Sequence, residues 1–406
     1  MLNNFTLGVN YWPINKAMYW WRNFDAQEVR RDFARLSQYN IKYIRIFLTW
    51  EDFQPEAQVI SPLMLDYLKN TADLAATYKL KLMPTFFCGH MSGANWMPKW
   101  MIEPSSAPSR FPLYSGNGIT KGQIKNFYKA EEILAAQVLQ ISKVCRSLKN
   151  HPAVCAYDLG NESSNCYVPS SCAQGQNWLK LLTDAVRENT NLPVTYGIHA
   201  EDLEENRNIG PLEVAKYCDF VVMHAYPFYL SWTDNPFDVW VLPFLGTITK
   251  WLAGKPVLLQ EFGAPSIPTI PPYLSEEEKK QLKCPIWTER EVKEYYTTSL
   301  SLLHEAGMLG AWAWCYGDYA PHLWNKTPLK QNYHERYFGL FRSDGSPKLA
   351  AQVFKDRGKL GVKHIDGESP TWLRDFKPDE FYFNPLKNLQ ILYQTYKKYL
   401  QNKEKK

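Results

Sequence analysis

The chain has 406 residues, of which 45% are hydrophobic and 15% aromatic, and its formal net charge is +5. Such a chain can bury one large hydrophobic core, and we see no Gly/Ser-rich linker or internal repeat that would divide it or build a solenoid. The small positive charge, without a basic stripe, argues against nucleic-acid binding, and no run reaches the roughly 20 apolar residues of a membrane-spanning helix.

The chain starts with "MLNNFTLGVNYWP", which enters a strand-like pattern almost at once. This stretch lacks the basic start and the long apolar run of a secretory signal peptide. We therefore expect a cytoplasmic protein that does not associate with membranes.

Eight short apolar runs are spread along the chain, with helical patterns between them. This alternation is typical of parallel strands joined by crossover helices, and it predicts an α/β fold, the closed (β/α)₈ or TIM barrel. An open doubly wound sheet is the alternative, although no G-x-G-x-x-G follows the first run. The eight predicted strands are residues 7–12, 41–48, 81–87, 153–159, 193–198, 218–226, 256–262 and 308–314.

The helical segments carry recognisable start signals. Asp25 to Glu28 has the pattern of a capping box, and Ser61-Pro62 supplies a cap followed by proline at the first helical position. Residues 130–148 and 290–306 repeat apolar residues at helical spacing. These segments are therefore predicted to be crossover helices.

Two connections are far longer than the 2–6 residues that usually join a strand to a helix. One runs from Cys88 to about Phe127 and the other covers residues 315–339, so they follow the third and the eighth predicted strands. Barrel active sites lie at the C-terminal ends of the strands, and both connections leave from there. We expect them to build walls around a groove, rather than only to cover the barrel core.

The end of the chain has a different pattern. We assign residues 1–355 to a barrel domain and 356–406 to a C-terminal extension. Within the extension an amphipathic helix is predicted to pack on the barrel exterior, in preference to an oligomer contact, and the oligomeric state is left open. Its apolar face comprises Leu386, Leu389, Tyr393, Tyr396 and Leu400.

The eight cysteines do not form a metal-binding pattern, and no C-x-x-C occurs. Most of them lie in apolar segments, where a free thiol behaves as a small hydrophobe. Cys166 and Cys172 share one predicted loop. A disulfide, a shared metal ion and two unpaired thiols all remain open for this pair, and unpaired thiols are favoured.

Polar residues at the C-terminal ends of the predicted strands are the candidate site. Glu162 ends the fourth strand and Glu261 the seventh, so in a closed barrel they face each other across the mouth. Hydrolysis of a glycosidic bond needs two such carboxyl groups, one to protonate the leaving oxygen and one to attack the anomeric carbon or to activate water. For a single glutamate at a strand end, a salt bridge is the ordinary alternative.

The neighbouring residues suit supporting roles. Arg45 and Tyr226 can donate hydrogen bonds to Glu261 and so keep it ionised and oriented. Asn161 can bond the sugar 2-hydroxyl, and Trp314 offers a flat surface for a pyranose ring. The chemistry requires no metal and no cofactor.

Four motifs at these strand ends, "LGNE", "HAY", "LQEFG" and "AWAW", resemble those of the retaining glycoside hydrolases of the (β/α)₈ clan, most closely glycoside hydrolase family 5. The resemblance covers about residues 5 to 355. It implies that Glu162 is the acid/base and Glu261 the nucleophile. The candidate substrate-binding residues are Arg45, His90, Trp96, Asn161, His224, Tyr226 and Trp314, and a buried histidine with a structural bond is the alternative for His90 and His224.

The resulting hypothesis is a retaining β-glycoside hydrolase that acts on oligosaccharides, preferably β-mannosidic ones. A β-glucosidase or β-1,4-glucanase of the same family is one alternative, and a non-catalytic carbohydrate-binding barrel is another. We also expect exo-action, because the two long connections could close one end of the groove and leave room for one or two sugar units.

Overall fold

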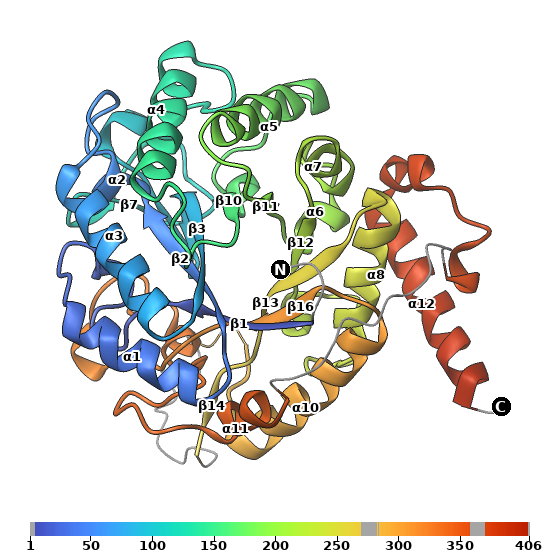
Figure 1. Ribbon diagram of the computed structural model, residues 1–406. Coiled ribbons are helices and arrows are strands. Elements are labelled where there is room, and N and C mark those ends of the chain that lie inside the picture. Colours follow the sequence, from blue (N-terminus) through green and yellow to red (C-terminus); the bar gives the residue numbers. More distant parts are fainter. Residues whose placement is uncertain (1–4, 269–281, 283, 358–369, 405–406) are drawn as a thin grey trace.

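The computed structural model describes residues 5–268, 282, 284–357 and 370–404, and it contains a barrel of eight parallel strands ringed by helices (Figure 1). Each predicted strand contains or overlaps one strand of this barrel. In chain order the strands are β1 (Thr6–Tyr11), β2 (Tyr43–Thr49), β3 (Lys81–Cys88), β10 (Tyr157–Asn161), β11 (Val194–Gly197), β12 (Val221–His224), β13 (Val257–Phe262) and β16 (Gly310–Ala313).

The sheet closes on itself. Its strand order is β11-β10-β3-β2-β1-β16-β13-β12. The two end strands are joined by a parallel bridge between His199 and His224, and the backbone N–H of His224 donates to the carbonyl of Ile198 at 3.0 Å. The predicted (β/α)₈ barrel is therefore confirmed, and the doubly wound alternative is wrong.

A helix follows each barrel strand. The Asp25 side chain caps the first of them by accepting from the N–H groups of Gln27 and Glu28, but Glu28 turns to Lys16 at 2.6 Å, so the capping box is only half formed. Among the described helices, none is long and apolar enough to cross a membrane. The eight helices that follow the barrel strands are α1 (Ala26–Gln38), α3 (Pro62–Thr77), α4 (Glu131–Ser147), α5 (Cys172–Arg187), α7 (Pro211–Tyr217), α8 (Val241–Ala253), α10 (Glu289–Glu305) and α11 (Leu349–Asp356).

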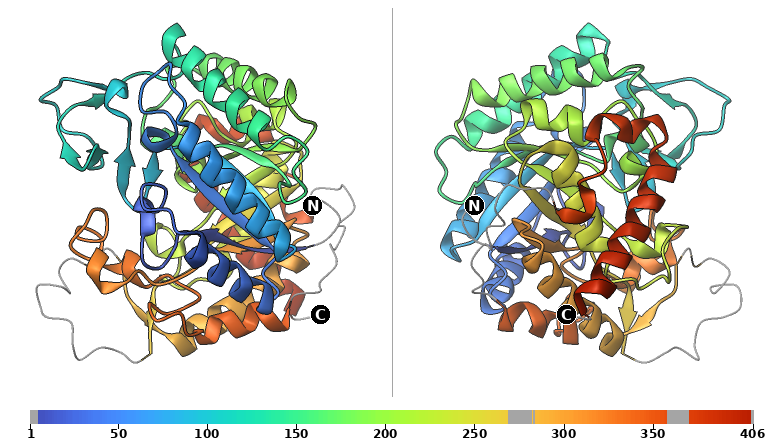
Figure 2. Two further views of the ribbon diagram at one scale, coloured as in Figure 1. Left: turned by 60° about the vertical axis from the view of Figure 1, so that its left-hand side comes forward. Right: turned by 90° about the vertical axis from the view of Figure 1, so that its right-hand side faces the viewer.

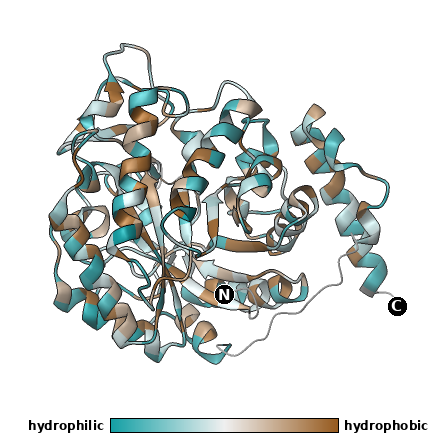
Figure 3. Cartoon of the chain, turned by 45° about the horizontal axis from the view of Figure 1, so that its top comes forward, coloured by the Kyte–Doolittle hydropathy of each residue, from teal (hydrophilic) through white to brown (hydrophobic). Residues whose placement is uncertain are grey.

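The barrel strands are buried on both faces, which explains why they read as continuous apolar runs. In Figure 3 the strands and the inner faces of the helices carry most of the hydrophobic colour. The inside of the barrel is filled tightly: a Cβ on Gly8 would lie 2.6 Å from the Trp312 ring. A polar side chain at a strand end therefore stands at the edge of an apolar core.

The two long connections lie at the same end of the barrel (Figure 2, left, cyan and orange). The connection after β3 folds into a small sheet of β4 (His90–Met91), β5 (Ala94–Trp96), β7 (Leu113–Ser115) and β8 (Gly118–Thr120). The connection after β16 contains two short 3₁₀ helices, η5 (Pro321–Leu323) and η6 (Tyr333–Tyr337).

The C-terminal helix α12 (Pro385–Glu404) lies beside α8 (Figure 2, right). The Tyr393 hydroxyl donates to Asp238 at 2.5 Å, and the Tyr393 ring contacts Phe244 of α8 at 4.9 Å. The expected apolar face needs one correction. Leu386 is 39% exposed, whereas Leu392, which we did not include, is buried.

All eight cysteines are free thiols. The Cys166 sulfur lies 3.5 Å from the side-chain oxygen of Asn95, and the Cys172 sulfur lies 3.4 Å from that of Asn208. Of the three alternatives for Cys166 and Cys172, the structure therefore contains the unpaired thiols.

Candidate active site

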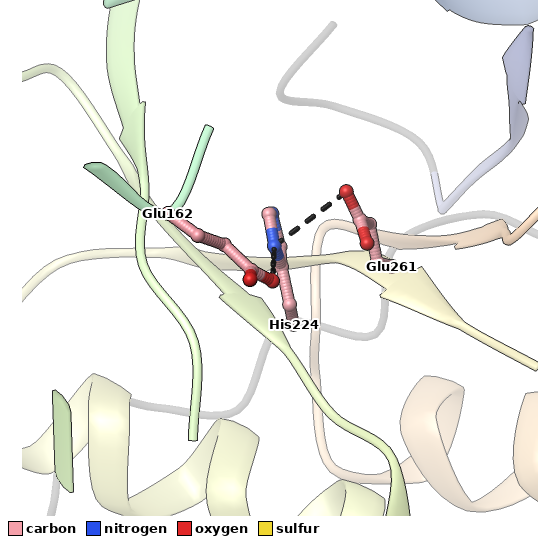
Figure 4. Close-up of side chains that lie close together, drawn as sticks. All are labelled: Glu162, His224 and Glu261. Atoms are coloured by element: carbon pink, nitrogen blue, oxygen red, sulfur yellow. Dashed lines mark hydrogen bonds and ion pairs between the residues drawn. The ribbon is translucent and has the colours of Figure 1, made fainter. Parts of the chain in front are cut away.

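Glu162 and Glu261 face each other at the C-terminal mouth of the barrel, with the His224 ring between them (Figure 4). His224 Nδ1 lies 2.8 Å from Glu162 Oε1 and 3.5 Å from Glu261 Oε1. One oxygen of each carboxylate and one nitrogen of the ring all lie within 4.8 Å of one another. The fold thus brings together two carboxyl groups that are 99 positions apart in the sequence.

Glu162 has an unusual backbone. It directly follows β10 and has φ 48° and ψ 43°, in the left-handed region. This conformation costs a residue with a side chain roughly 1–2 kcal/mol, and such residues are concentrated at functional sites. The conformation starts a sharp turn, after which Asn165 donates from its amide to Glu162 Oε2 at 3.1 Å.

Glu261 is held from two sides. Arg45 Nη1 donates to Glu261 Oε1 at 2.5 Å, and the Tyr226 hydroxyl donates to Oε2 at 2.9 Å. Arg45 is fully buried, and it also binds Asp158 at 2.7 Å and Asn161 Oδ1 at 2.8 Å. It is not among the residues that line the cavity, and of its two predicted roles the structure contains the hydrogen bond to Glu261. Its contacts are those of a residue that positions Glu261 and Asn161.

Both ring nitrogens of His224 lie within hydrogen-bond distance of an oxygen. Nδ1 faces Glu162 Oε1, and Nε2 faces the side-chain oxygen of Gln260 at 2.8 Å. The Gln260 amide nitrogen donates to Asp158, which fixes the oxygen toward the histidine. Both ring nitrogens therefore face acceptors, as the doubly protonated imidazolium requires.

The charges in this cluster shift the pKa values. Burial acts against a charged His224, but the negative charges of Glu261 and Glu162 outweigh it and raise the pKa of the imidazole. Burial raises the pKa of Glu261 despite His224 and Arg45. For Glu162, burial is overcome by the charges of His199 and His224, which lower its pKa. The pKa of His224 is thus raised and that of Glu162 lowered, and the two side chains lie 2.8 Å apart.

The same three residues form the one group of acidic, histidine and cysteine side chains in the described part of the chain that is compact enough for a metal ion. Their existing partners compete with such an ion. Both nitrogens of His224 already face oxygen acceptors, and the Arg45 guanidinium already supplies a positive charge to Glu261. The arrangement fits a protonated hydrogen-bonded cluster better than a set of metal ligands.

A cavity of about 390 Å³ lies above the carboxylates. His90 is part of its wall and is held by its Nδ1, 2.8 Å from Asn95 Oδ1, while its carbonyl accepts from Asn161 at 2.7 Å. Burial lowers the pKa of His90, so the ring is neutral at pH 7. Of the nine residues assigned to the site from the sequence, seven line this cavity: His90, Asn161, Glu162, His224, Tyr226, Glu261 and Trp314.

Trp96 is not among the residues that line the cavity. It lies on β5 and is 7% exposed, with its ring centroid 4.1 Å from that of Tyr114 and 5.6 Å from that of Tyr19. Its side chain is thus used in packing the small sheet against the barrel. The structure therefore does not place Trp96 beside the two carboxylates, and its assignment as a substrate contact stays a prediction.

The two long connections meet over one end of the cavity. The Ser92 hydroxyl donates to Glu335 at 2.9 Å, and the Asn332 amide donates to the Ser92 carbonyl at 2.7 Å. Ser92 and Gly93 have φ values of 51° and 75°, as in a tight two-residue hairpin turn. None of the described residues that line the cavity precedes His90 in the sequence. The described lining of the cavity thus comes from His90 and later residues.

The sequence did not point to the rest of the cavity wall. On the Glu162 side, Arg110 donates to both oxygens of Glu201 at 2.6 and 2.7 Å. On the opposite side, Glu335 follows His334 on η6. Arg110, His334 and Glu335 lie in the two long connections, so only the length of these connections indicated them, whereas Glu201 begins a short helix after β11. The unassigned lining residues include Arg110, Phe111, Asn165, His199, Glu201, Tyr229, Asn332, His334, Glu335 and Phe338.

Comparisons with known proteins agree with this architecture. The family model described as "Glycosyl hydrolases family 2, TIM barrel domain" matches residues 112–360, which is more than half of the chain. A β-glucuronidase of Mus musculus is 25% identical over 224 residues, and one of Rattus norvegicus is 23% identical over the same length. Each match covers 53% of this chain, and the chain spans only 30% of the length of either relative.

Solved structures share the fold over a larger part of the chain. A GH5_18 protein of Streptomyces cattleya in complex with GlcNAc is 20% identical, with a TM-score of 0.72, over 88% of this chain and 80% of that one. An exo-β-1,4-mannosidase of Opitutaceae bacterium strain TAV5 is 24% identical, with a TM-score of 0.69, over 87% of this chain and 59% of that one. At these identities the likeness shows the barrel fold.

Proposed function

The chain belongs to the family of glycosyl hydrolases family 2 TIM barrel domains, and from this premise we propose that it hydrolyses β-linked oligosaccharides with retention of configuration. One observation carries the proposal of retention: the facing oxygens of Glu162 and Glu261 lie within 4.8 Å. Retaining enzymes place their two carboxyl groups about 5–5.5 Å apart, whereas inverting enzymes leave about 6.5–9.5 Å for a water molecule.

In the proposed reaction, Glu261 attacks the anomeric carbon while Glu162 gives its proton to the glycosidic oxygen, so the bond to the leaving group breaks as the ester bond forms. Glu162 then takes a proton from water, and the resulting hydroxide displaces Glu261 from the sugar. His224 Nδ1 lies 2.8 Å from Glu162 Oε1 and orients this carboxyl group. Arg45 and Tyr226 orient Glu261 throughout.

We propose β-mannose as the preferred terminal sugar and β-glucose as the second candidate. The similarity to an exo-β-1,4-mannosidase, and to a Streptomyces cattleya GH5_18 structure in complex with Manβ1-4GlcNAc, supports this choice. The curated relatives favour β-glucuronides instead. A uronate needs a cation, but among the described lining residues no lysine occurs and the one arginine, Arg110, is paired with Glu201. This composition favours a neutral sugar.

The substrate proposal predicts the ranking of aryl glycosides. We expect kcat/KM to be highest for an aryl β-mannoside, lower for the β-glucoside and lowest for the β-glucuronide, because only the last brings a carboxylate into this cavity. Initial rates with the three substrates at equal concentration measure the ranking. Binding of oligosaccharides without turnover of any β-glycoside would instead identify a carbohydrate-binding barrel.

Exo-action is proposed from the closed end of the cavity. Support comes from the two long connections, which contact each other through Ser92, Asn332 and Glu335 at the cavity, and from a cavity volume of about 390 Å³, which has room for few sugar units. A polymer could not run through such a site, whereas the end of a short chain could enter it.

For a β-1,4-linked hexasaccharide labelled at the reducing end, we expect the first products to be shortened by one or two units from the non-reducing end. Early samples separated by size measure this. An early mixture of internal fragments would mean that the two connections do not close the groove in solution, and exo-action would then be rejected while β-glycoside hydrolysis stood.

A further inference from the structure

Asn165 lies against Glu162, and the reaction proposed above gives it no role. Glu162 is in the left-handed conformation and starts the short 3₁₀ helix η3 (Ser163–Asn165). Side chains three residues apart in a 3₁₀ helix lie one above the other, so this turn carries Asn165 back to the carboxyl group. The Asn165 amide nitrogen donates to Glu162 Oε2 at 3.1 Å, and its backbone N–H donates to the Glu162 carbonyl at 2.9 Å. What we infer from this contact rests on the proposed function.

Two arginines determine how the Asn165 amide is oriented. Arg207 Nη1 donates to Asn165 Oδ1 at 3.1 Å, and Arg110 Nη1 donates to the same oxygen at 3.3 Å. A guanidinium group has no acceptor, so the atom that faces both groups must be the amide oxygen. The amide nitrogen is then turned to Glu162, where a carboxylate oxygen accepts from it. Asn165 can therefore meet Glu162 only as a donor.

The contacts of Asn165 are buried and join separate parts of the barrel mouth. Asn165 is 9% exposed and Arg207 is 5% exposed. Arg110 belongs to the connection after β3, whereas Arg207 follows α6 (Glu201–Glu204), which comes after β11. Asn95 of β5 adds a bond from its amide nitrogen to the Asn165 carbonyl at 3.1 Å. Asn165 is thus held in place by side chains from two different connections, as a preorganised donor needs to be.

The two oxygens of Glu162 have different partners. Oε1 faces His224 Nδ1 at 2.8 Å, and Oε2 accepts from Asn165 at 3.1 Å. The last torsion of a glutamate side chain has broad energy wells, so the plane of the carboxyl group is set by its hydrogen bonds. In the proposed reaction this group gives up a proton in the first step and takes one back in the second, and both transfers need its oxygens in place. Without Asn165, His224 alone among the described hydrogen-bond partners would hold the carboxyl group.

We propose that Asn165 is a positioning residue that donates to Oε2 of Glu162, fixes the plane of this carboxyl group and favours its ionised form. A hydrogen bond to the charged form of a carboxyl group stabilises that form. Arg110 and Arg207 act through Asn165, because a charged donor on the amide oxygen polarises the amide and strengthens the bond that its nitrogen donates. The glycosyl-enzyme intermediate needs the ionised form, since Glu162 then takes the proton of water. The contribution of Asn165 is therefore expected to be largest in the second step.

The kinetics of Asn165→Ala on a dinitrophenyl β-mannoside test this role. The leaving group needs no protonation, so hydrolysis of the intermediate limits turnover. Loss of a positioned base should lower kcat by about 10- to 100-fold, the cost of a misplaced catalytic group. KM should fall by a similar factor because the intermediate accumulates, and kcat/KM should stay within about 3-fold of the wild-type value. A poorly folded preparation would instead lower kcat and kcat/KM equally and leave KM unchanged.

Asn165→Asp is a second variant with nearly the same shape. Its carboxylate still accepts from Arg110 and Arg207, but it places a negative charge where Glu162 needs a donor. Repulsion between like charges favours the protonated form of Glu162, so the alkaline limb of kcat/KM should move to higher pH by about 1 to 3 units. In Asn165→Ala the loss of the hydrogen bond alone should move it upward by about 1 to 2 units. Profiles of rate against pH measure both shifts.

The other titratable groups around Glu162 are the same in the wild type and in both variants, so the shifts report the change at Asn165. They include His90, Cys166, His199, His224, Tyr226 and Glu261. Asn70→Asp makes the same chemical change at an exposed position of α3, and it should leave kcat, KM and the alkaline limb at their wild-type values.

An alkaline limb that stays in place in both Asn165 variants, or an Asn165→Ala enzyme that loses kcat without a fall in KM, would overturn the role of Asn165. Both readouts are independent of how much of a preparation is folded. A wild-type enzyme without turnover of any β-glycoside would instead refute the proposed function itself, so the two failures are distinguishable.

Discussion

Replacing Glu261 by glycine is expected to lower kcat/KM on an aryl β-mannoside by roughly 10⁴- to 10⁶-fold, the scale seen when a covalent nucleophile is removed. The substitution leaves Arg45 and Tyr226 without the carboxylate to which they donate, but it opens space beside the anomeric carbon. Rates from matched enzyme preparations, with thermal unfolding as a check on folding, measure the loss.

Azide should partly restore this variant. A small anion can occupy the vacated space and attack the anomeric carbon from the same face as Glu261. Because only one displacement then takes place, the product should be the α-glycosyl azide from a β-glycoside. Glu56→Gly, at an exposed position, is the matched control and should neither lose activity nor form an azide product. A Glu261→Gly enzyme that yields no α-azide at any concentration would remove Glu261 from the nucleophile role.

The sequence was sufficient to predict the barrel and the two glutamates that face each other at its mouth, and the reason is physical. Strands buried on both faces give continuous apolar runs, and the C-terminal ends of parallel strands converge at one mouth. Glu162 and Glu261 could therefore be placed face to face without a structure. The role of Arg45 was only partly predicted, because the sequence could not show that this strand residue is fully buried and not among those that line the cavity.

The contacts made by the two long connections, after β3 and β16, could not be predicted from the sequence. Ser92 and Glu335 are 243 positions apart and belong to segments without periodicity, so no pattern in either segment predicts their contact. The position of Trp96 outside the cavity lining could not be predicted, because its orientation depends on the pairing of β5 with β4 and β7. A residue on a short strand within a long connection can face the cavity or the packed interior, and composition does not distinguish the two.

The charge of the cluster predicts how activity depends on pH. The pKa of Glu261 is raised above its usual 4.5, so the ionised nucleophile forms only as the pH rises past a higher value. The pKa of His224 is raised above its usual 6.5, so the proton beside Glu162 is kept until a pH above that value. The profile of kcat/KM should be bell-shaped, with its acid limb above pH 4.5 and its alkaline limb above pH 6.5.

Replacing Glu162 by glutamine should test, independently of the pH profile, whether Glu162 protonates the leaving group. Glutamine cannot give a proton to the leaving oxygen, so kcat/KM on a poor leaving group such as an alkyl alcohol should fall by roughly 10²- to 10⁴-fold, the usual contribution of general acid catalysis. A dinitrophenyl glycoside needs no protonation to leave, so its kcat/KM should fall far less and should lose the alkaline limb. Equal losses for both leaving groups, or a wild-type rate that stays flat well above neutral pH, would contradict the acid/base role.

Because His224 Nδ1 lies 2.8 Å from Glu162 in the wild type, the alkaline limb reports the proton that these two residues share, and its selective loss in the variant would assign that proton to the leaving group.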